Sequence, residues 1–312
     1  MGHRWVKRLF IDKRYKTGAD DPEENEDPAD YTMIFATVED NVHLLRASPS
    51  YLKSLAAMPE DLRRAYRYGD WDALGGGYFK EFGPATHAVK PFRPPEHWPR
   101  YRSFDYGLDM FACLWWAVDE DGRAWCVREF ERKGLIVQQA AARLLENTLP
   151  YERVEATYAP PDMWSRQKDT GRTMAELFAL GGVPLVKSGN SRVQGHMLVK
   201  EMLAPLPLTD PFVKSLWPEG QAPAALPGLM FFEGCKTVMG DLRDIQADEL
   251  NPNDCAKQPH EVTHTVDAVR YFCVSRSLSA ERPAEAETEE EEEGEDYEAY
   301  MTGGAYTEAW MD

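Results

Sequence analysis

Three aspartates stand at positions where a carboxylate suits chemistry better than packing. Asp105 interrupts the apolar segment 103–107, where an unpaired buried charge would be strongly destabilising unless a cation or another partner compensates it. Asp162 follows the apolar segment 154–158, and Asp267 lies in the last amphipathic segment of the chain. Carboxylate oxygens are hard ligands that suit Mg²⁺ or Mn²⁺, so the three residues are candidates for one metal site.

A histidine shares a helix face with the third aspartate. At about 100° per residue, an apolar stripe forms on one side of segment 261–277, from Val262, Val266, Val269 and Cys273. Roughly opposite it lie His260, His264, Asp267 and Tyr271. His264 is therefore one turn from Asp267 and joins the candidate site, whereas His260 and Glu261 are expected to cap the helix or to support the site.

Each candidate also has an ordinary interpretation. Asp105 could be a buried acid paired with an arginine, and Asp162 could be a turn or helix-capping residue. The face with His264 and Asp267 could simply be solvated. The residue pattern alone leaves these alternatives open.

The elements around the candidates predict an α/β domain. Strands are expected at 102–107, 111–118 and 124–130, with Glu120-Asp121-Gly122 as the turn of a hairpin. After them, helices and strands alternate: helix 137–149, strand 154–158, helix 173–180, strand 183–187, helix 193–203, strand 229–232 and helices 235–245 and 261–277. This order predicts a mixed sheet flanked by helices on both faces.

The remaining segments mark boundaries. Strand-like pieces are expected at 31–38 and 42–45, and two short helices within 48–69. The proline-rich segment 90–100 is expected to be a semi-rigid linker, and the proline-rich segment 204–230 an inserted loop or hairpin that could cover the site.

The net charge of −18 comes from two segments. Residues 281–312 hold 13 acids and one base and are expected to be disordered, and residues 20–30 hold seven acids. The rest of the chain has 34 basic and 33 acidic residues, so whole-chain charge does not exclude a nucleic-acid partner. The five cysteines are dispersed, and no apolar run reaches the roughly 18 residues of a membrane helix, so we expect reduced thiols in a soluble intracellular protein.

The motifs resemble those of a known family. Phe104-Asp105-Tyr106-Gly107, segment 158–164 and the run His264-Thr265-Val266-Asp267-Ala268-Val269-Arg270-Tyr271 are similar to the three acidic motifs in the C-terminal nuclease domain of tailed-phage terminase large subunits. Segments 2–7, 69–71 and 78–79 also resemble the end of the terminase ATPase domain and the run into the nuclease. The resemblance covers about 1–278. Walker A and B motifs are absent from this sequence, so we expect no ATPase activity from it.

The resemblance implies an RNase H-like fold and a domain division. Residues 1–89 would be the end of an ATPase-like domain and a helical connector, 90–100 a linker, 101–279 the nuclease and 280–312 an acidic tail. Asp105 would bridge two ions of Mg²⁺ or Mn²⁺, Asp162 would hold one of them, and Asp267 with His264 the other.

The implied activity is metal-dependent cleavage of concatemeric viral DNA during genome packaging, in the host cytoplasm. Partners would be double-stranded DNA, the portal protein and the small terminase subunit, with no membrane involved. Basic residues on both sides of the second motif are candidates for phosphate contacts: Arg166, Lys168, Arg172, Lys187, Arg192 and Lys200. Alternatives are another RNase H-like nuclease of the resolvase or transposase type, and a non-catalytic docking module for the portal or small subunit.

Overall fold

The structure, a computed structural model, describes residues 4–13, 15, 25–71, 77–107, 109–166, 171–248 and 250–280. The predicted acidic tail beyond residue 280 and Lys168 lie outside the described residues.

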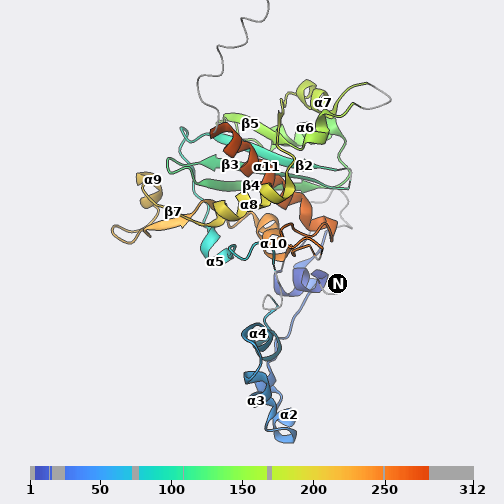
Figure 1. The fold of residues 1–312 in the computed structure, drawn as a ribbon, viewed down its shortest axis with the longest axis vertical. Coiled ribbons are helices and arrows are strands. Elements are labelled where there is room, and N and C mark those ends of the chain that lie inside the picture. Colours follow the sequence, from blue (N-terminus) through green and yellow to red (C-terminus); the bar gives the residue numbers. More distant parts are fainter. Residues whose placement is uncertain are drawn as a thin grey trace, which may run out of the picture.

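The described residues form one seven-stranded mixed sheet, with the strand order β1-β9-β4-β3-β2-β5-β6 (Figure 1). The strands are β1 (Ala88–Val89), β2 (Arg100–Tyr106), β3 (Phe111–Val118), β4 (Ala124–Arg132), β5 (Val154–Ala159), β6 (Val186–Lys187) and β9 (Leu229–Phe232). β2, β3 and β4 are antiparallel neighbours, whereas β5 pairs in parallel with β2, and β6 with β5. The first five strands after β1 therefore lie in the order 3-2-1-4-5. This confirms the predicted mixed sheet and agrees with the RNase H-like fold that the resemblance implied.

Helices cover both faces of this sheet. On one face, Phe104 of β2 packs with α6 (Val137–Glu146) and with Phe178 of α7 (Met174–Leu180). On the other face lie α8 (Arg192–Leu203), α10 (Lys236–Asp244) and α11 (Thr263–Ala280), of which α11 crosses β2 and β3 (Figure 1). Trp116 of β3 stacks on Phe272 of α11 with ring centroids 4.3 Å apart, which fixes the height of that helix above the sheet.

A glycine lets α8 approach α11 closely. A Cβ atom at Gly195 would lie 2.7 Å from Cγ of Arg270 and 3.0 Å from Cγ2 of Val274. Real Cβ contacts are longer than this, so only glycine fits between the two helices at this point.

The proline-rich insertion is attached to the end of the sheet remote from Asp105. It contains β7 (Pro205–Pro207), α9 (Pro211–Lys214) and β8 (Ala225–Pro227), and β7 pairs with β8. The buried guanidinium of Arg123 donates to the carbonyl oxygens of Pro227, Leu206 and Pro207 and to the carboxylate of Asp119. Arg123 follows the β3–β4 turn, whereas Asp105 pairs with Ala112 near the other end of β3, so the expectation that this insertion covers the site is wrong.

The segment predicted as a linker packs on the sheet. Trp98 is buried, and Phe92 contacts the rings of Trp125 and Phe232. Just before it, α5 (Pro84–His87) leads into β1, which extends the sheet beside β9. Residues 84–99 therefore pack as part of the same body as the strands.

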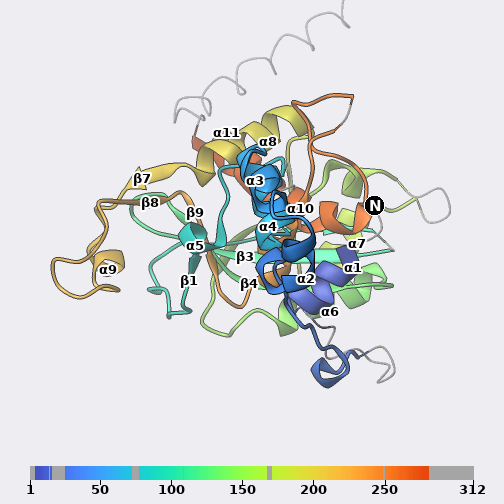
Figure 2. The same ribbon diagram turned by 90° about the horizontal axis from the view of Figure 1, so that it is seen from below.

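The N-terminal helices form an arm that projects from the sheet (Figures 1 and 2). It comprises α2 (Val42–Ala47), α3 (Tyr51–Ala56) and α4 (Glu60–Tyr68), and the last two confirm the two short helices predicted there. The predicted strands at 31–38 and 42–45 are wrong, because 31–37 is irregular and 42–47 is helical. Asn41 explains the helix, since its side chain accepts a hydrogen bond from the backbone N–H of Leu44 and so caps α2.

The N-terminal segment that precedes this arm in the sequence lies against the sheet domain. The short helical turns α1 (Arg4–Val6) and η1 (Lys7–Ile11) lie next to α10, where Lys7 pairs with Asp244 at 2.9 Å and Asp12 with Arg243 at 2.6 Å. The remaining turns are η3 (Pro28–Asp30), η4 (Val38–Asp40), η5 (Pro161–Trp164) and η6 (His260–Val262). Over the described ranges, none of the helices combines the length and the apolar character needed to span a membrane.

Candidate active site

Asp105 and His264 meet between the sheet and α11. Residues 101, 103 and 105 of β2 face α11 because side chains alternate along a strand, and this places the carboxylate of Asp105 under the helix. Nδ1 of His264 lies 2.8 Å from Oδ2 of Asp105. The side chains are 3% and 20% exposed respectively, so the alternative of a solvated face does not hold at His264. The side chain of Asp105 is hydrogen-bonded to a histidine, whereas the other alternative was an arginine.

Asp267 lies one turn after His264 on α11, and two arginines hold its carboxylate. Its Oδ1 accepts a hydrogen bond of 2.8 Å from Nε of Arg270, and its Oδ2 lies 3.3 Å from Nη1 of Arg192, which begins α8. Nε2 of His196 on α8 lies 3.8 Å from Oδ1. The side chain of Asp267 is 13% exposed, so these contacts compensate a largely buried charge.

The pKa values of the two aspartates move in opposite directions. Burial raises the pKa of Asp105, and the charge of Asp267 raises it further, against the effect of the hydrogen bond with His264. For Asp267, burial acts to raise the pKa, but the nearby His196 ring and the charges of Arg270 and Arg192 outweigh this effect and lower the pKa strongly. The two carboxylates are thus close enough to sense each other, and Asp267 is ionised at neutral pH.

Asp162 lies at the same edge of the sheet but apart from this network. β5 is parallel to β2 and ends at Ala159, three residues before Asp162 in η5, so both strands bring an aspartate to their carboxyl ends. The carboxylate of Asp162 is exposed and makes no hydrogen bond or ion pair within the described part of the chain. Of the four predicted site residues, the structure therefore brings Asp105, His264 and Asp267 together and leaves Asp162 beside them.

Two further residues, Asp109 and His260, complete the surroundings of His264. Asp109 lies in the loop from β2 to β3, and its Oδ2 is 2.8 Å from Nδ1 of His260 and 3.3 Å from Nε2 of His264. Sequence reasoning assigned a supporting or capping role to His260 and none to Asp109. The pattern His260-Glu261-Val262-Thr263-His264, with two histidines four residues apart, is a signal that could have marked this pair as candidate metal ligands.

A second cluster lies behind Asp267. Nδ1 of His196 is 2.9 Å from Oδ1 of Asp254, and Sγ of Cys255 is 3.5 and 3.6 Å from the two ring nitrogens. Because the two distances are nearly equal, the sulfur does not point along the lone pair of either nitrogen. Burial raises the pKa of this thiol to about 12. With the Arg192 guanidinium also next to it, the cluster is suited to holding Asp267 and not to binding a cation.

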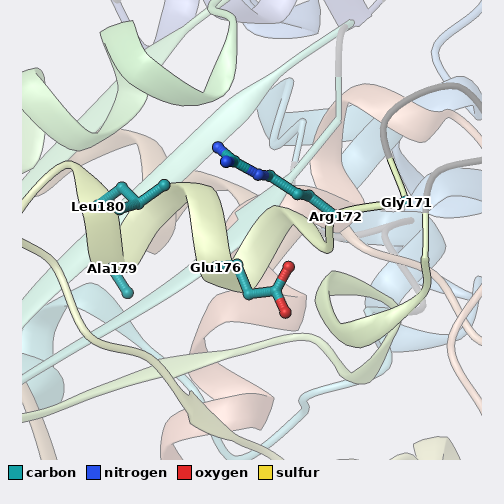
Figure 3. A pocket seen from close by; sticks show the side chains of 5 residues that line it. All are labelled: Gly171, Arg172, Glu176, Ala179 and Leu180. Carbon is teal, nitrogen blue, oxygen red and sulfur yellow. The ribbon is translucent and has the colours of Figure 1, made fainter.

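The described basic candidates fall into two groups. Arg166, Arg172 and Lys187 are exposed, and in Figure 3 the guanidinium of Arg172 and the carboxylate of Glu176 point away from each other beside α7. Lys187 lies over the ring of Trp164, 6.0 Å from its centroid.

The second group of basic candidates makes internal contacts. Arg192 is engaged with Asp254 and Asp267. Lys200 lies 3.8 Å from the centroid of the Tyr78 ring.

Comparison with known proteins finds matches among solved structures. No protein-family model matches the chain, and no curated protein matches it in sequence. Among solved structures, the large terminase of a thermophilic bacteriophage is 19% identical with a TM-score of 0.47, over 88% of this chain and 60% of that one. The nuclease domain of the P22 large terminase is 19% identical with a TM-score of 0.48, over 65% of this chain and 93% of that domain.

A bacterial protein bound to a branched DNA is also similar. Thermus thermophilus RuvC in complex with a Holliday junction substrate is 16% identical with a TM-score of 0.28, over 57% of this chain and 96% of that one. The chain thus spans about 60% of the length of the thermophilic-phage terminase.

Proposed function

We propose that this chain is a divalent-metal-dependent DNA endonuclease that cleaves concatemeric viral DNA during genome packaging. The observation that carries the proposal is the meeting of Asp105 from β2 with His264 and Asp267 from α11 at the edge of the sheet where β5 delivers Asp162. Double-stranded DNA would be the substrate, and the portal protein and small terminase subunit, in the host cytoplasm, would be partners.

The site fits hard divalent cations. Two neighbouring carboxylates with one raised pKa form a place where added positive charge is stabilising. Asp105, Asp162 and Asp267 would hold the ions through oxygen, which suits Mg²⁺ or Mn²⁺, and an imidazole ligand from His264 would favour Mn²⁺. When bound, two such ions activate water and stabilise the leaving oxygen of a phosphodiester.

The protein residues have separate tasks in this scheme. His264 orients the carboxylate of Asp105 through its Nδ1 atom. Arg192 and Arg270 keep Asp267 ionised and fix its direction. Because they already compensate the charge of Asp267, we expect weak metal affinity that increases when substrate phosphate is present. Arg166, Lys168, Arg172 and Lys187 would contact the DNA backbone.

The test is nicking of supercoiled plasmid by the purified chain with Mn²⁺, with Mg²⁺ and with chelator. Metal-dependent nicking is expected, with loss of activity in Asp105→Asn and Asp267→Asn and reduced activity in Asp162→Asn. Glu219→Gln is the matched control, because Glu219 is an exposed acid in the remote insertion. Circular dichroism must show that each variant is folded.

Two outcomes would redirect the proposal. Cleavage restricted to four-way junctions would identify a resolvase-type nuclease. Absence of both cleavage and Mn²⁺ binding in the folded chain would reject the nuclease site and leave a docking module as the better account.

A further inference from the structure

We propose that Asp109, His260 and His264 form a separate binding site for a single transition-metal ion such as Zn²⁺. Their ligand atoms all lie within 4.8 Å of one another, at the point where the β2–β3 loop meets the start of α11. Asp162 and Asp267 take no part in this site, whereas His264 is shared with the proposed nuclease site. The inference is tested by Zn²⁺ binding and not by cleavage, so the two proposals can fail separately.

The spacing of the ligand atoms matches one small ion. Two ligands at about 2.1 Å from an ion lie about 3.0 to 3.4 Å from each other in octahedral or tetrahedral geometry. Oδ2 of Asp109 is 2.8 Å from Nδ1 of His260 and 3.3 Å from Nε2 of His264. Both distances are within a few tenths of an ångström of that spacing, and all three ligand atoms lie within 4.8 Å of one another.

The ring of His264 is already oriented as a metal ligand. Its Nδ1 is hydrogen-bonded to Asp105, so Nε2 is the nitrogen that faces Asp109. In metal sites, a ligating histidine almost always donates its other ring N–H to a carboxylate or carbonyl, which fixes the tautomer and makes the free nitrogen a better ligand. Asp105 supplies this carboxylate here.

His260 supplies the second imidazole from the turn before α11. The rings of His260 and His264 are perpendicular, with centroids 4.5 Å apart, and the four-residue spacing brings both to the same side of the chain. Two imidazoles and one carboxylate form a donor set that prefers Zn²⁺ and similar ions to Mg²⁺.

The site is open to exchange with solvent. Asp109 and His260 are 59% and 55% exposed, so an ion can enter and keep water in its remaining positions. A bound ion would tie the loop after β2 to η6 and would hold His264 in the orientation that Asp105 requires.

Zn²⁺ binding to the chelator-stripped chain, measured by isothermal titration calorimetry, tests the proposal. We expect a site that His260→Gln and Asp109→Asn each weaken by more than about tenfold, since even changes to residues that only orient ligands cost that much. The same variants should lose the rise in melting temperature that Zn²⁺ gives to the unchanged chain. Both substituted side chains are exposed, so folding should persist.

Two controls separate this site from others. His97→Gln removes another exposed histidine paired with a carboxylate, 3.5 Å from Glu120, and should leave Zn²⁺ binding unchanged. Asp162→Asn should weaken Mn²⁺ binding at the proposed nuclease site and leave Zn²⁺ binding unchanged. Zn²⁺ affinity that is undetectable in the unchanged chain, or is equal in the unchanged chain, His260→Gln and Asp109→Asn, would overturn the proposal.

Discussion

Asp105 and Asp267 sit in contrasting electrostatic surroundings although they are neighbours. Asp105 has a histidine as its partner and a raised pKa, whereas Asp267 has two arginines and a lowered one. A pair of carboxylates whose pKa values are pushed apart is typical of sites where each acid has its own role. Asp267 is a permanent anion, and Asp105 is the group whose charge depends most on a bound cation.

Arg192 gives a prediction at this scale. Because it contacts Asp254 and Asp267, Arg192→Gln should lower the cleavage rate by about tenfold, the size of effect seen when an orienting residue is lost. DNA affinity should change little. Lys187→Gln is the comparison, since this exposed lysine should weaken DNA binding and reduce the salt dependence of log K by about one.

Cleavage kinetics and DNA binding at several salt concentrations distinguish the two roles. If Arg192→Gln lowers DNA affinity and its salt dependence as Lys187→Gln does, Arg192 contacts phosphate, as the sequence analysis expected, and does not orient Asp267.

The sequence pattern was informative for residues on regular elements and less so elsewhere. His264 and Asp267 could be placed on one face because α11 is a continuous helix. Helix periodicity also placed His260 on this face, although His260 lies in the turn η6 before the helix. Asp109 lies in a loop, which helix periodicity cannot place. The arginines on Asp267 depend on how α8 packs against α11, which local patterns do not contain.

At the scale of elements, the close contact between α8 and α11 determines where Asp267 points. Arg270 fills the space beside Gly195 and at the same time donates to Asp267. Packing of the two helices and orientation of the carboxylate are therefore coupled through one side chain.

Substitution of Gly195 by alanine should destabilise the domain. Alanine favours a helix by about 1 kcal/mol over glycine, but its Cβ would lie 2.7 Å from Arg270, and overpacking of this kind costs about 1 to 3 kcal/mol. A net loss of free energy of unfolding is expected in urea titrations. Gly234→Ala is the control, because a Cβ there meets nothing within 4 Å. Equal or higher stability of Gly195→Ala would show that α11 can shift without cost.

Prediction of the elements succeeded where burial and turns acted together. β3 and β9 match the predicted strands at both ends, because their apolar runs are bounded by turn residues. The wrong strand predictions at 31–45 have a different cause. Apolar residues of this segment, such as Ile34 and Phe35, are exposed on the irregular stretch before the arm. Hydrophobicity there therefore does not indicate burial in a sheet. The prediction of a linker at 90–100 rested on the prolines of this segment, whereas its aromatic residues pack on the sheet.

At the scale of the whole molecule, Arg123 joins three segments that are distant in sequence. It pairs with Asp119 at 2.8 Å and holds β7 and β8 by their carbonyl oxygens, and both charged side chains of the pair are fully buried. Asp119 also accepts a hydrogen bond from Nε1 of Trp125.

Arg123→Met should therefore be severely destabilising. It would leave Asp119 buried without its cation, and breaking a buried pair from one side costs about 3 to 5 kcal/mol. The double variant Asp119→Asn with Arg123→Met removes both charges and should recover part of this loss. Thermal and urea unfolding measure both effects. A single variant no less stable than the double variant would contradict the account.

The buried pair of Arg123 and Asp119 and the acidic site lie at opposite ends of the sheet, so their contributions to stability should be independent. Arg123 follows one end of β3, and Asp105 lies beside the other end, with most of a strand between them. Substitutions far apart and without shared partners usually have additive effects. Variation in the proline-rich insertion should thus be able to accumulate independently of the acidic site, so that this end of the domain is free to acquire new contacts while the chemistry at the opposite end is retained.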